Sequence, residues 1–274
     1  MALLGPAEVR DLAAALDLQP TKKLGQNFVV DANTVRKIVR TAGVEAGDEV
    51  LEVGPGLGSL TLGLLEAGAR VTAVELDGRL ADLLPRTVAE LAPGAELVVV
   101  HDDALRVPVP GAPTRLVANL PYNVSVPVLL HLLATVPSLQ SALVMVQAEV
   151  GQRIAAAPGS KVYGSPSVKA AWYGEWTTAG TISRQVFWPV PNVDSILVSY
   201  RRSGQARGTA AERDAVFALV DAAFGQRRKM LRQALSELYG GAAAASARIE
   251  AAGLDPTVRG EQLSVADFLA LARV

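Results

Sequence analysis

The sequence contains no cysteine, which excludes disulfide bonds, thiolate nucleophiles and cysteine-ligated metal centres. Its two histidines, His101 and His131, are too few for a multi-histidine site, so we expect no bound metal. It also has no run of about 18 apolar residues, the length that a membrane-spanning helix needs. The first twenty residues lack the basic start and long apolar stretch of a secretory signal. These absences predict a cytoplasmic protein with no membrane association.

Charged residues are also scarce, at 19% of the chain, whereas 50% of the residues are hydrophobic. A chain of 274 residues with this composition can fold around a sizeable core, in one large domain or two. The net charge of −1 conceals an uneven distribution, because residues 201–274 carry an excess of basic side chains and residues 1–200 an excess of acidic ones. That asymmetry is a weak indication of a polyanionic partner for the C-terminal part.

Short apolar strands alternate with helical segments over much of the first 200 residues. The predicted strands are residues 49–53, 70–74, 97–100, 115–118 and 142–146, and the predicted helices are residues 59–67, 79–91 and 126–133. Strands that alternate with helices pair in parallel through right-handed crossovers. We therefore predict an α/β fold with a doubly wound sheet over residues 1–200, closed by strands at 182–185 and 195–200.

The pattern changes after Tyr200. Residues 201–208 are polar and contain glycine, as linkers do. The remainder of the chain has helical spacing at residues 211–224, 227–239, 244–252 and 264–273. We therefore predict a second, small helical domain over residues 201–274.

Four consecutive strands of the predicted sheet end in residues that suit a nucleoside ligand. Gly54–Gly58 form a glycine-rich turn that opens a helix, where backbone N–H groups are available. Glu75 ends the second strand and can accept hydrogen bonds from both ribose hydroxyls. Asp103 follows the third strand, and Asn119–Tyr122 follow the fourth. Each feature alone also suits an ordinary strand end, but the four together predict a nucleoside-cofactor site at this edge.

Together these residues resemble a class I S-adenosylmethionine-dependent methyltransferase of the adenine-N6 type. The segments Lys22–Phe28 and Phe187–Ser195 narrow the resemblance to the ribosomal RNA adenine dimethyltransferases. Residues Phe224–Arg232 are similar to the branch that acts on small-subunit (16S) rRNA, rather than to the large-subunit (23S) enzymes that confer macrolide resistance. The resemblance runs from about residue 20 to the C-terminus, and it implies a Rossmann-like class I fold with S-adenosylmethionine as the cofactor.

The resemblance also implies which residues would bind the cofactor. Gly54 would lie beneath the methionine moiety, and Glu75 would hold the ribose. Asp103 rather than Asp102 would meet the adenine, because the family pattern is an aspartate followed directly by alanine. Val29 stands where the family often has leucine, and another apolar contact should serve as well. The implied cofactor-binding set is Asn27, Val29, Gly54, Gly56, Glu75, Asp103 and Asn119.

The implied catalytic residues are Asn119, Leu120, Pro121, Tyr122 and Phe187. The adenine N6 lone pair is delocalised into the ring, so this amine is a poor nucleophile. The Asn119 side-chain oxygen and the carbonyl of Leu120 or Pro121 would accept its hydrogens and favour a pyramidal nitrogen, so that positioning and electrostatics supply the acceleration. Tyr122 and Phe187 would stack on an extruded base, unless they are simply core aromatics.

One residue departs from the family pattern. Trp188 stands where members more often have a small or polar residue. It would either crowd the mouth of the base pocket or pack under the loop.

Basic clusters supply the expected RNA-binding residues. Acidic residues are absent from Gln226 through Ser236, which favours a phosphate-contacting surface there. The alternative is that the aliphatic stems of these side chains cover the helical core. The predicted RNA-binding residues are Lys22, Lys23, Arg227, Arg228, Lys229 and Arg232.

The resemblance implies a function in ribosome biogenesis. A 16S-type enzyme would transfer four methyl groups from S-adenosylmethionine to N6 of two adjacent adenines in a hairpin of the immature small subunit. We expect a monomer, since no interface pattern is evident. Two alternatives stay open: a 23S rRNA methyltransferase, and a non-catalytic ribosome-assembly or nucleic-acid-binding protein on the same fold.

Overall fold

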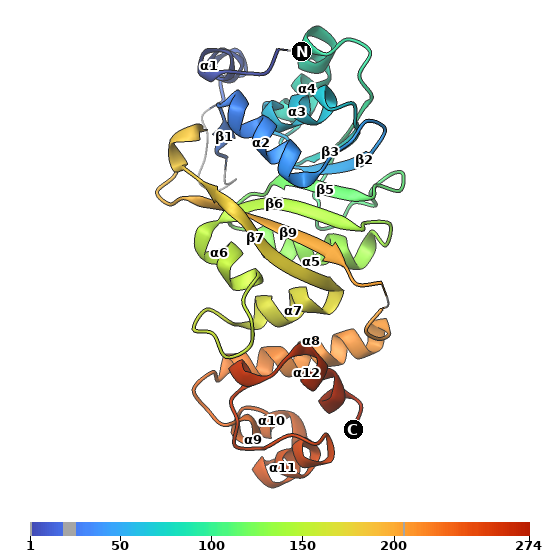
Figure 1. Cartoon of the computed structure of the whole chain (residues 1–274), viewed down its shortest axis with the longest axis vertical. Coiled ribbons are helices and arrows are strands. Elements are labelled where there is room, and N and C mark those ends of the chain that lie inside the picture. The colour runs from blue at the N-terminus through green and yellow to red at the C-terminus, as the bar shows by residue number, and fades with distance from the viewer. Residues whose placement is uncertain (1, 19–25, 205) are drawn as a thin grey trace. The chain divides into compact units, whose positions relative to one another are not determined.

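A seven-stranded sheet in the order β4-β3-β2-β5-β6-β9-β7 organises the first part of the molecule (Figure 1). Neighbours from β4 to β6 pair in parallel, and β9 pairs antiparallel with β6. The strands are β2 (Glu49–Val53), β3 (Arg70–Glu75), β4 (Leu97–His101), β5 (Arg115–Asn119), β6 (Ser141–Gln147), β7 (Gly174–Ile182) and β9 (Ser195–Arg202). The predicted α/β class is therefore confirmed, and so are the five predicted parallel strands.

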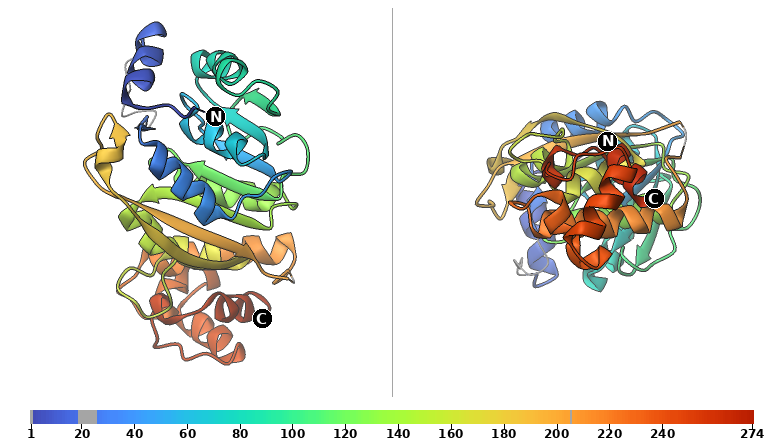
Figure 2. Two further views of the ribbon diagram at one scale, coloured as in Figure 1. Left: turned by 45° about the horizontal axis from the view of Figure 1, so that its top comes forward. Right: turned by 90° about the horizontal axis from the view of Figure 1, so that it is seen from below.

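The strand order reverses beside β2, because β3 and β4 lie on one side of it and β5 and β6 on the other. In doubly wound sheets such a reversal leaves a crevice at the carboxyl ends of the strands, where ligands bind. Helices lie against the sheet (Figure 2). They are α1 (Pro6–Ala15), α2 (Ala32–Ala42), α3 (Ser59–Glu66), α4 (Gly78–Leu91), α5 (Ser125–Thr135) and α6 (Ala148–Ile154).

Local sequence explains where these helices begin and end. Asp31 caps α2 by accepting hydrogen bonds from the N–H groups of Asn33 and Thr34, and Gly43 ends it in the left-handed conformation (φ 62°). Helix α3 is buried on nearly every side, which matches its almost wholly apolar sequence. The predicted helices at 59–67, 79–91 and 126–133 correspond to α3, α4 and α5.

The predicted strand at 182–185 is wrong. Ile182 is the last residue of β7, and Arg184–Val186 form a short 3₁₀ turn, η2. The side chain of Ser183 accepts a hydrogen bond from the N–H of Gln185, and this local bond favours the turn over an extended strand. The turn leads into a separate two-stranded ribbon, in which β1 (Phe28–Val29) pairs antiparallel with β8 (Phe187–Trp188).

The computed structural model describes residues 2–18, 26–204 and 206–274, and it divides the chain into two compact units. The first unit extends to Gly151 and includes Thr177–Arg202, and the second comprises Gln152–Trp176 and Ser203–Val274. Residues 152–176 thus group with the C-terminal helices, although the sequence pattern placed them in the first domain. The physical reason is aromatic packing, because Trp172 and Tyr173 each meet Phe217 edge to face.

The second unit is helical. The predicted helix at 227–239 is wrong, because α8 ends at Gly225 and residues 226–230 form a turn. The N–H groups of Leu231 and Arg232 donate to the carbonyls of Val258 and Pro256, so a tertiary contact fixes the start of the next helix. The helices are α7 (Ser165–Tyr173), α8 (Ala210–Gly225), α9 (Leu231–Ala234), α10 (Ser236–Tyr239), α11 (Ala242–Ala251) and α12 (Val265–Ala272), with a 3₁₀ turn η3 (Gly260–Gln262).

Candidate active site

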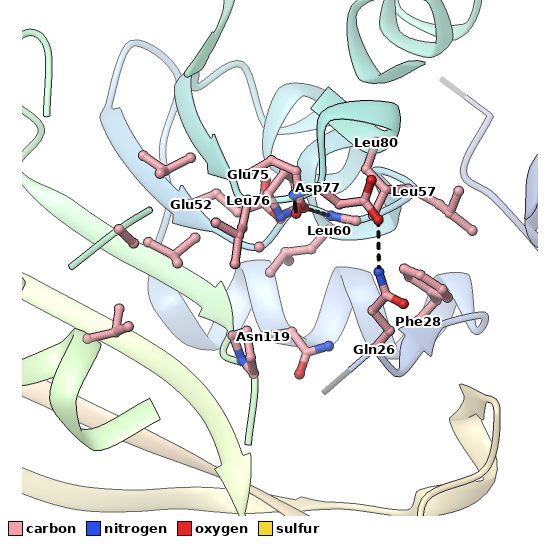
Figure 3. Close-up of a pocket in the computed structure, with 18 of the residues that line it drawn as sticks. Gln26, Phe28, Glu52, Leu57, Leu60, Glu75, Leu76, Asp77, Leu80 and Asn119 are labelled. Carbon is pink, nitrogen blue, oxygen red and sulfur yellow. Dashed lines mark hydrogen bonds between the residues drawn. The ribbon is translucent and has the colours of Figure 1, made fainter. Parts of the chain in front are cut away.

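A cavity opens at the carboxyl ends of β2, β3, β4 and β5 (Figure 3). Residues from four separate turns and from the segment before β1 line it. The seven residues predicted to bind a cofactor all lie around this one cavity: Asn27, Val29, Gly54, Gly56, Glu75, Asp103 and Asn119. Of the predicted catalytic residues, Asn119 and Pro121 line it as well.

The glycine-rich turn has the backbone that its sequence predicts. Gly54, Gly56 and Gly58 have φ values of 68°, 58° and 94°, in the left-handed region that favours glycine. A Cβ atom on Gly56 would lie 2.7 Å from Cε1 of Phe28, so a side chain there would collide with the ring. The turn is therefore shaped to bring backbone, rather than side chains, to the cavity.

Glu75 holds this turn in place. Its carboxylate accepts hydrogen bonds from the N–H groups of Gly56 (3.0 Å) and Asp77 (2.9 Å), and the residue is 7% exposed. Burial raises its pKa, while the hydrogen bonds from Asp77 and Gly56 oppose that shift. Each oxygen accepts one backbone N–H and has capacity for another donor, such as a ribose hydroxyl.

Glu52 is a wall residue that the sequence pattern did not single out. It is 1% exposed and accepts a 2.7 Å hydrogen bond from the hydroxyl of Thr61. Burial raises its pKa to about 8; the hydrogen bond from Thr61 opposes this shift, and the nearby charge of Glu75 adds to it. Glu52 is therefore mostly protonated at pH 7. Its position at the end of β2, directly before the turn, is the signal that could have identified it.

Two further lining residues were also not predicted. Phe28 is 7% exposed and lies over the glycine-rich turn, next to Gln26 in Figure 3. Leu76 follows Glu75 and has an apolar side chain that is 57% exposed at the cavity. Its signal in the sequence is an apolar residue directly after the strand-end acid.

Asn119 has its amide oriented by the backbone. Its side-chain nitrogen Nδ2 donates a 3.0 Å hydrogen bond to the carbonyl oxygen of Asn27. A carbonyl oxygen can only accept, so this partner fixes which end of the amide is nitrogen. The other end, Oδ1, is thereby presented as an acceptor for a substrate amine.

The remaining predicted catalytic residues lie away from the cavity lining. Leu120 is buried, and its N–H donates to the carbonyl of Met145 (3.1 Å). The Tyr122 hydroxyl forms a 2.6 Å hydrogen bond with Oγ of Ser195, and burial raises its pKa. Phe187 is 2% exposed within the hydrophobic core, which favours the core-aromatic alternative for this residue.

Trp188 packs against a wall of the cavity. Its ring stacks on Phe28, with centroids 6.3 Å apart and planes inclined by 25°. Of the two expected positions, packing against the polypeptide therefore describes it better than crowding the base pocket.

The predicted RNA-binding residues are in different environments. Arg227 forms a 2.7 Å ion pair with Glu261 and donates to the carbonyl of Lys161 (2.8 Å). Arg228 and Lys229 are exposed, and Arg232 is half-buried. Lys22 and Lys23 lie outside the described residues.

The described part of the chain offers neither a metal cluster nor a membrane-spanning helix. Residues 2–18, 26–204 and 206–274 contain no group of three or more histidine or acidic side chains placed to hold a metal ion. Among the helices within those ranges, none is long and apolar enough to cross a membrane.

Comparisons with known proteins agree with this geometry. The family model described as ribosomal RNA adenine dimethylase matches residues 18–274. A protein of Leifsonia xyli named ribosomal RNA small subunit methyltransferase A is 71% identical, over 98% of each chain. A protein of Streptomyces coelicolor with the same name is 62% identical, over 99% of this chain and 96% of its own.

Solved structures share the fold. A dimethyladenosine transferase from Plasmodium falciparum superposes with a TM-score of 0.75 at 23% identity, covering 88% of this chain and 94% of its own. A 23S rRNA methyltransferase, ErmE, gives 0.66 at 24% identity, covering 90% and 98%. At these identities the two structures support the fold alone.

Proposed function

The chain belongs to the ribosomal RNA adenine dimethylase family, and from that membership we propose that its substrate is the 16S rRNA of the immature small ribosomal subunit. It is an S-adenosylmethionine-dependent rRNA adenine N6-dimethyltransferase with the class I methyltransferase fold. Two relatives that cover nearly the whole chain are named as small-subunit enzymes, which supports the proposed substrate. Two adjacent adenines of a hairpin would each receive two methyl groups.

The cavity suits the cofactor. S-adenosylmethionine supplies, when bound, an electrophilic methyl group on a positively charged sulfonium. Carboxylates line the cavity, and these suit a cationic ligand: Glu52, Glu75, Asp77, Asp102 and Asp103. Glu75 would hold the ribose with its remaining acceptor capacity, Asp103 would meet the adenine, and Gly54 would lie beneath the methionine end. Asn27, Val29, Gly56 and Asn119 would complete the pocket.

The orientation of Asn119 is the observation that carries the chemistry. Because Asn27 accepts from Nδ2, Oδ1 is placed to accept a hydrogen from the adenine N6. The Pro121 carbonyl already accepts from the N–H of Val124, so we assign the second acceptor to the Leu120 carbonyl. These acceptors hold the amine with its lone pair toward the methyl group. The N–C bond forms as the S–C bond breaks, and the resulting ammonium releases its proton to water.

A second round requires a site that tolerates the monomethylated amine. Only one N6 hydrogen then remains, and the single Asn119 acceptor is sufficient to hold it. Tyr122 would stack on the extruded base, with its hydroxyl anchored to Ser195. Phe187 would support this wall from the core.

The division of labour between domains is also part of the proposal. The α/β part carries the chemistry, and the helical part contacts rRNA through the basic surface, which we define as Arg228, Lys229 and Arg232. Arg227 is engaged by Glu261, so its contribution to phosphate binding would be smaller. The enzyme would act as a monomer in the cytoplasm, where its substrate is assembled.

Purified protein, methyl-labelled S-adenosylmethionine and both immature ribosomal subunits, assayed in parallel, test the substrate. Label in the small subunit supports the proposal. Label in the large subunit would favour the 23S alternative, and label in neither would favour a non-catalytic binding protein.

A further inference from the structure

The short ribbon formed by β1 and β8 connects two parts of the site that are far apart in the sequence. Phe28 pairs with Trp188, and Val29 pairs with Phe187. The N–H of Val30 extends the pairing with a 2.8 Å hydrogen bond to the carbonyl of Val186. The ribbon thus ties the segment that lines the cofactor cavity to the segment that follows β7.

Phe28 is held between two surfaces. On one side its ring edge lies against Gly56, at a distance that leaves no room for a Cβ atom. On the other side the indole of Trp188 stacks on it at 6.3 Å. Phe28 is 7% exposed and lines the cavity, so its position sets the shape of one cavity wall.

The same segment holds the reaction centre. Asn27, directly before Phe28, accepts the hydrogen bond that orients the Asn119 amide. A displacement of Phe28 would therefore act on two features, the glycine-rich turn and the Asn119 acceptor.

We propose that Trp188 is a positioning residue for cofactor binding: its indole holds Phe28 against Gly56 and so keeps the cavity in its binding shape. Trp188 is half-buried rather than enclosed, and so its removal leaves a notch at the surface instead of a core cavity. The predicted effect falls on cofactor affinity more than on stability. The inference rests on S-adenosylmethionine binding and does not depend on which rRNA is the substrate.

Calorimetric titration of full-length variants with S-adenosylmethionine tests this role. Trp188→Ala should raise the Kd by roughly threefold to tenfold, the range expected for loss of one aromatic pair. Its melting temperature without cofactor should stay close to that of the parent protein. Trp188→Phe, which keeps a ring over Phe28, is the matched control and should stay within about twofold of the parent Kd.

A double-mutant cycle adds a readout that a general structural role would not produce. Phe28→Leu removes the ring that Trp188 positions, so Trp188→Ala should have little further effect on the Kd in that background. Should Trp188→Ala fail to fold, Trp188→Leu, which fills similar space without a ring, takes its place with the same expected direction. Fully additive effects on the Kd, or an unchanged Kd in a folded Trp188→Ala variant, would overturn the proposal.

A spectroscopic signal provides the second measurement. The chain has three tryptophans, and Trp172 and Trp176 belong to the second unit. In a Trp172→Phe, Trp176→Phe background, Trp188 becomes the sole indole, and S-adenosylmethionine should change its emission in a saturable way that matches the calorimetric Kd. Emission that is unchanged at saturating cofactor would contradict a coupling between Trp188 and the cavity.

Discussion

Replacing Glu52 by glutamine should change how the stability of this protein depends on pH. Glu52 is enclosed beneath the cofactor cavity, and burial raises its pKa to about 8 from an ordinary value of 4.5. Glutamine has nearly the same shape and stays neutral at every pH, and its carbonyl can still accept the hydrogen bond from Thr61. The substitution therefore removes the ionisation while keeping the packing.

The magnitude follows from proton linkage. Below about pH 4.5, Glu52 is protonated in both the folded and the unfolded chain, so its contribution to the free energy of unfolding does not change with pH. Between pH 4.5 and about 8, the unfolded chain releases this proton while the folded chain retains it, so stability falls by about 1.4 kcal/mol per pH unit. The accumulated cost to the parent protein is on the order of a few kcal/mol by pH 8, and it stays constant above that pH.

Urea unfolding followed by circular dichroism at pH 5, 6, 7 and 8 measures this effect. The difference in unfolding free energy between Glu52→Gln and the parent should grow with pH, in favour of the variant. Glu90→Gln is the control, because Glu90 is exposed and its removal should leave the pH dependence unchanged. Parallel curves for Glu52→Gln and the parent would refute the assignment of a neutral carboxyl beneath the cavity.

Three further predictions address the cofactor, the base and the rRNA. Glu75→Ala should weaken S-adenosylmethionine binding by about 1 to 3 kcal/mol, since the partners of a charged acceptor are left unpaired; unchanged affinity in a folded variant, measured by calorimetry, would remove Glu75 from the site. Tyr122→Ala should keep cofactor affinity but slow methylation by the equivalent of roughly 1–3 kcal/mol of stacking, whereas Phe187→Ala should cost about 3–5 kcal/mol of stability because its ring is in the core; a small change in the melting temperature of Phe187→Ala would restore the stacking role. Neutralising the basic surface should flatten the salt dependence of small-subunit binding by ~0.7 to 0.9 in slope for each phosphate that the protein no longer neutralises, whereas Arg227→Gln should change the slope less; an unaltered slope in a stable triple variant would exclude this surface from the rRNA interface.

The sequence predicts the strand ends well because their signals are local. Each of β2, β3, β4 and β5 is a short apolar run that stops at a polar or glycine residue, and parallel pairing brings those ends to one edge. Glu75 and Asn119 could therefore be placed beside one cavity without any knowledge of distant contacts.

Features that depend on distant contacts could not be predicted. The β1–β8 ribbon joins Phe28 to Trp188 across some 160 residues, and neither strand is long enough to be recognised by alternation. Arg227 has no acidic neighbour nearby in the sequence, but Glu261 reaches it in the folded chain. The predicted helix at 227–239 failed for the same reason, since the carbonyls of Pro256 and Val258 decide where α9 begins.

The central claim is that methyl transfer occurs at Asn119, with its amide oriented by the carbonyl of Asn27. Asn119→Asp is nearly isosteric, yet it replaces the donor Nδ2 with an oxygen that the Asn27 carbonyl repels. Nucleoside analysis by mass spectrometry of small-subunit rRNA, after timed incubation with S-adenosylmethionine, measures the outcome directly. We predict two N6,N6-dimethyladenosines per rRNA for the parent protein, and for Asn119→Asp a rate lower by about 100-fold, the usual cost of removing one positioned catalytic hydrogen bond, with cofactor affinity changed by much less. Dimethyladenosine formed by Asn119→Asp at the parent rate would contradict the claim.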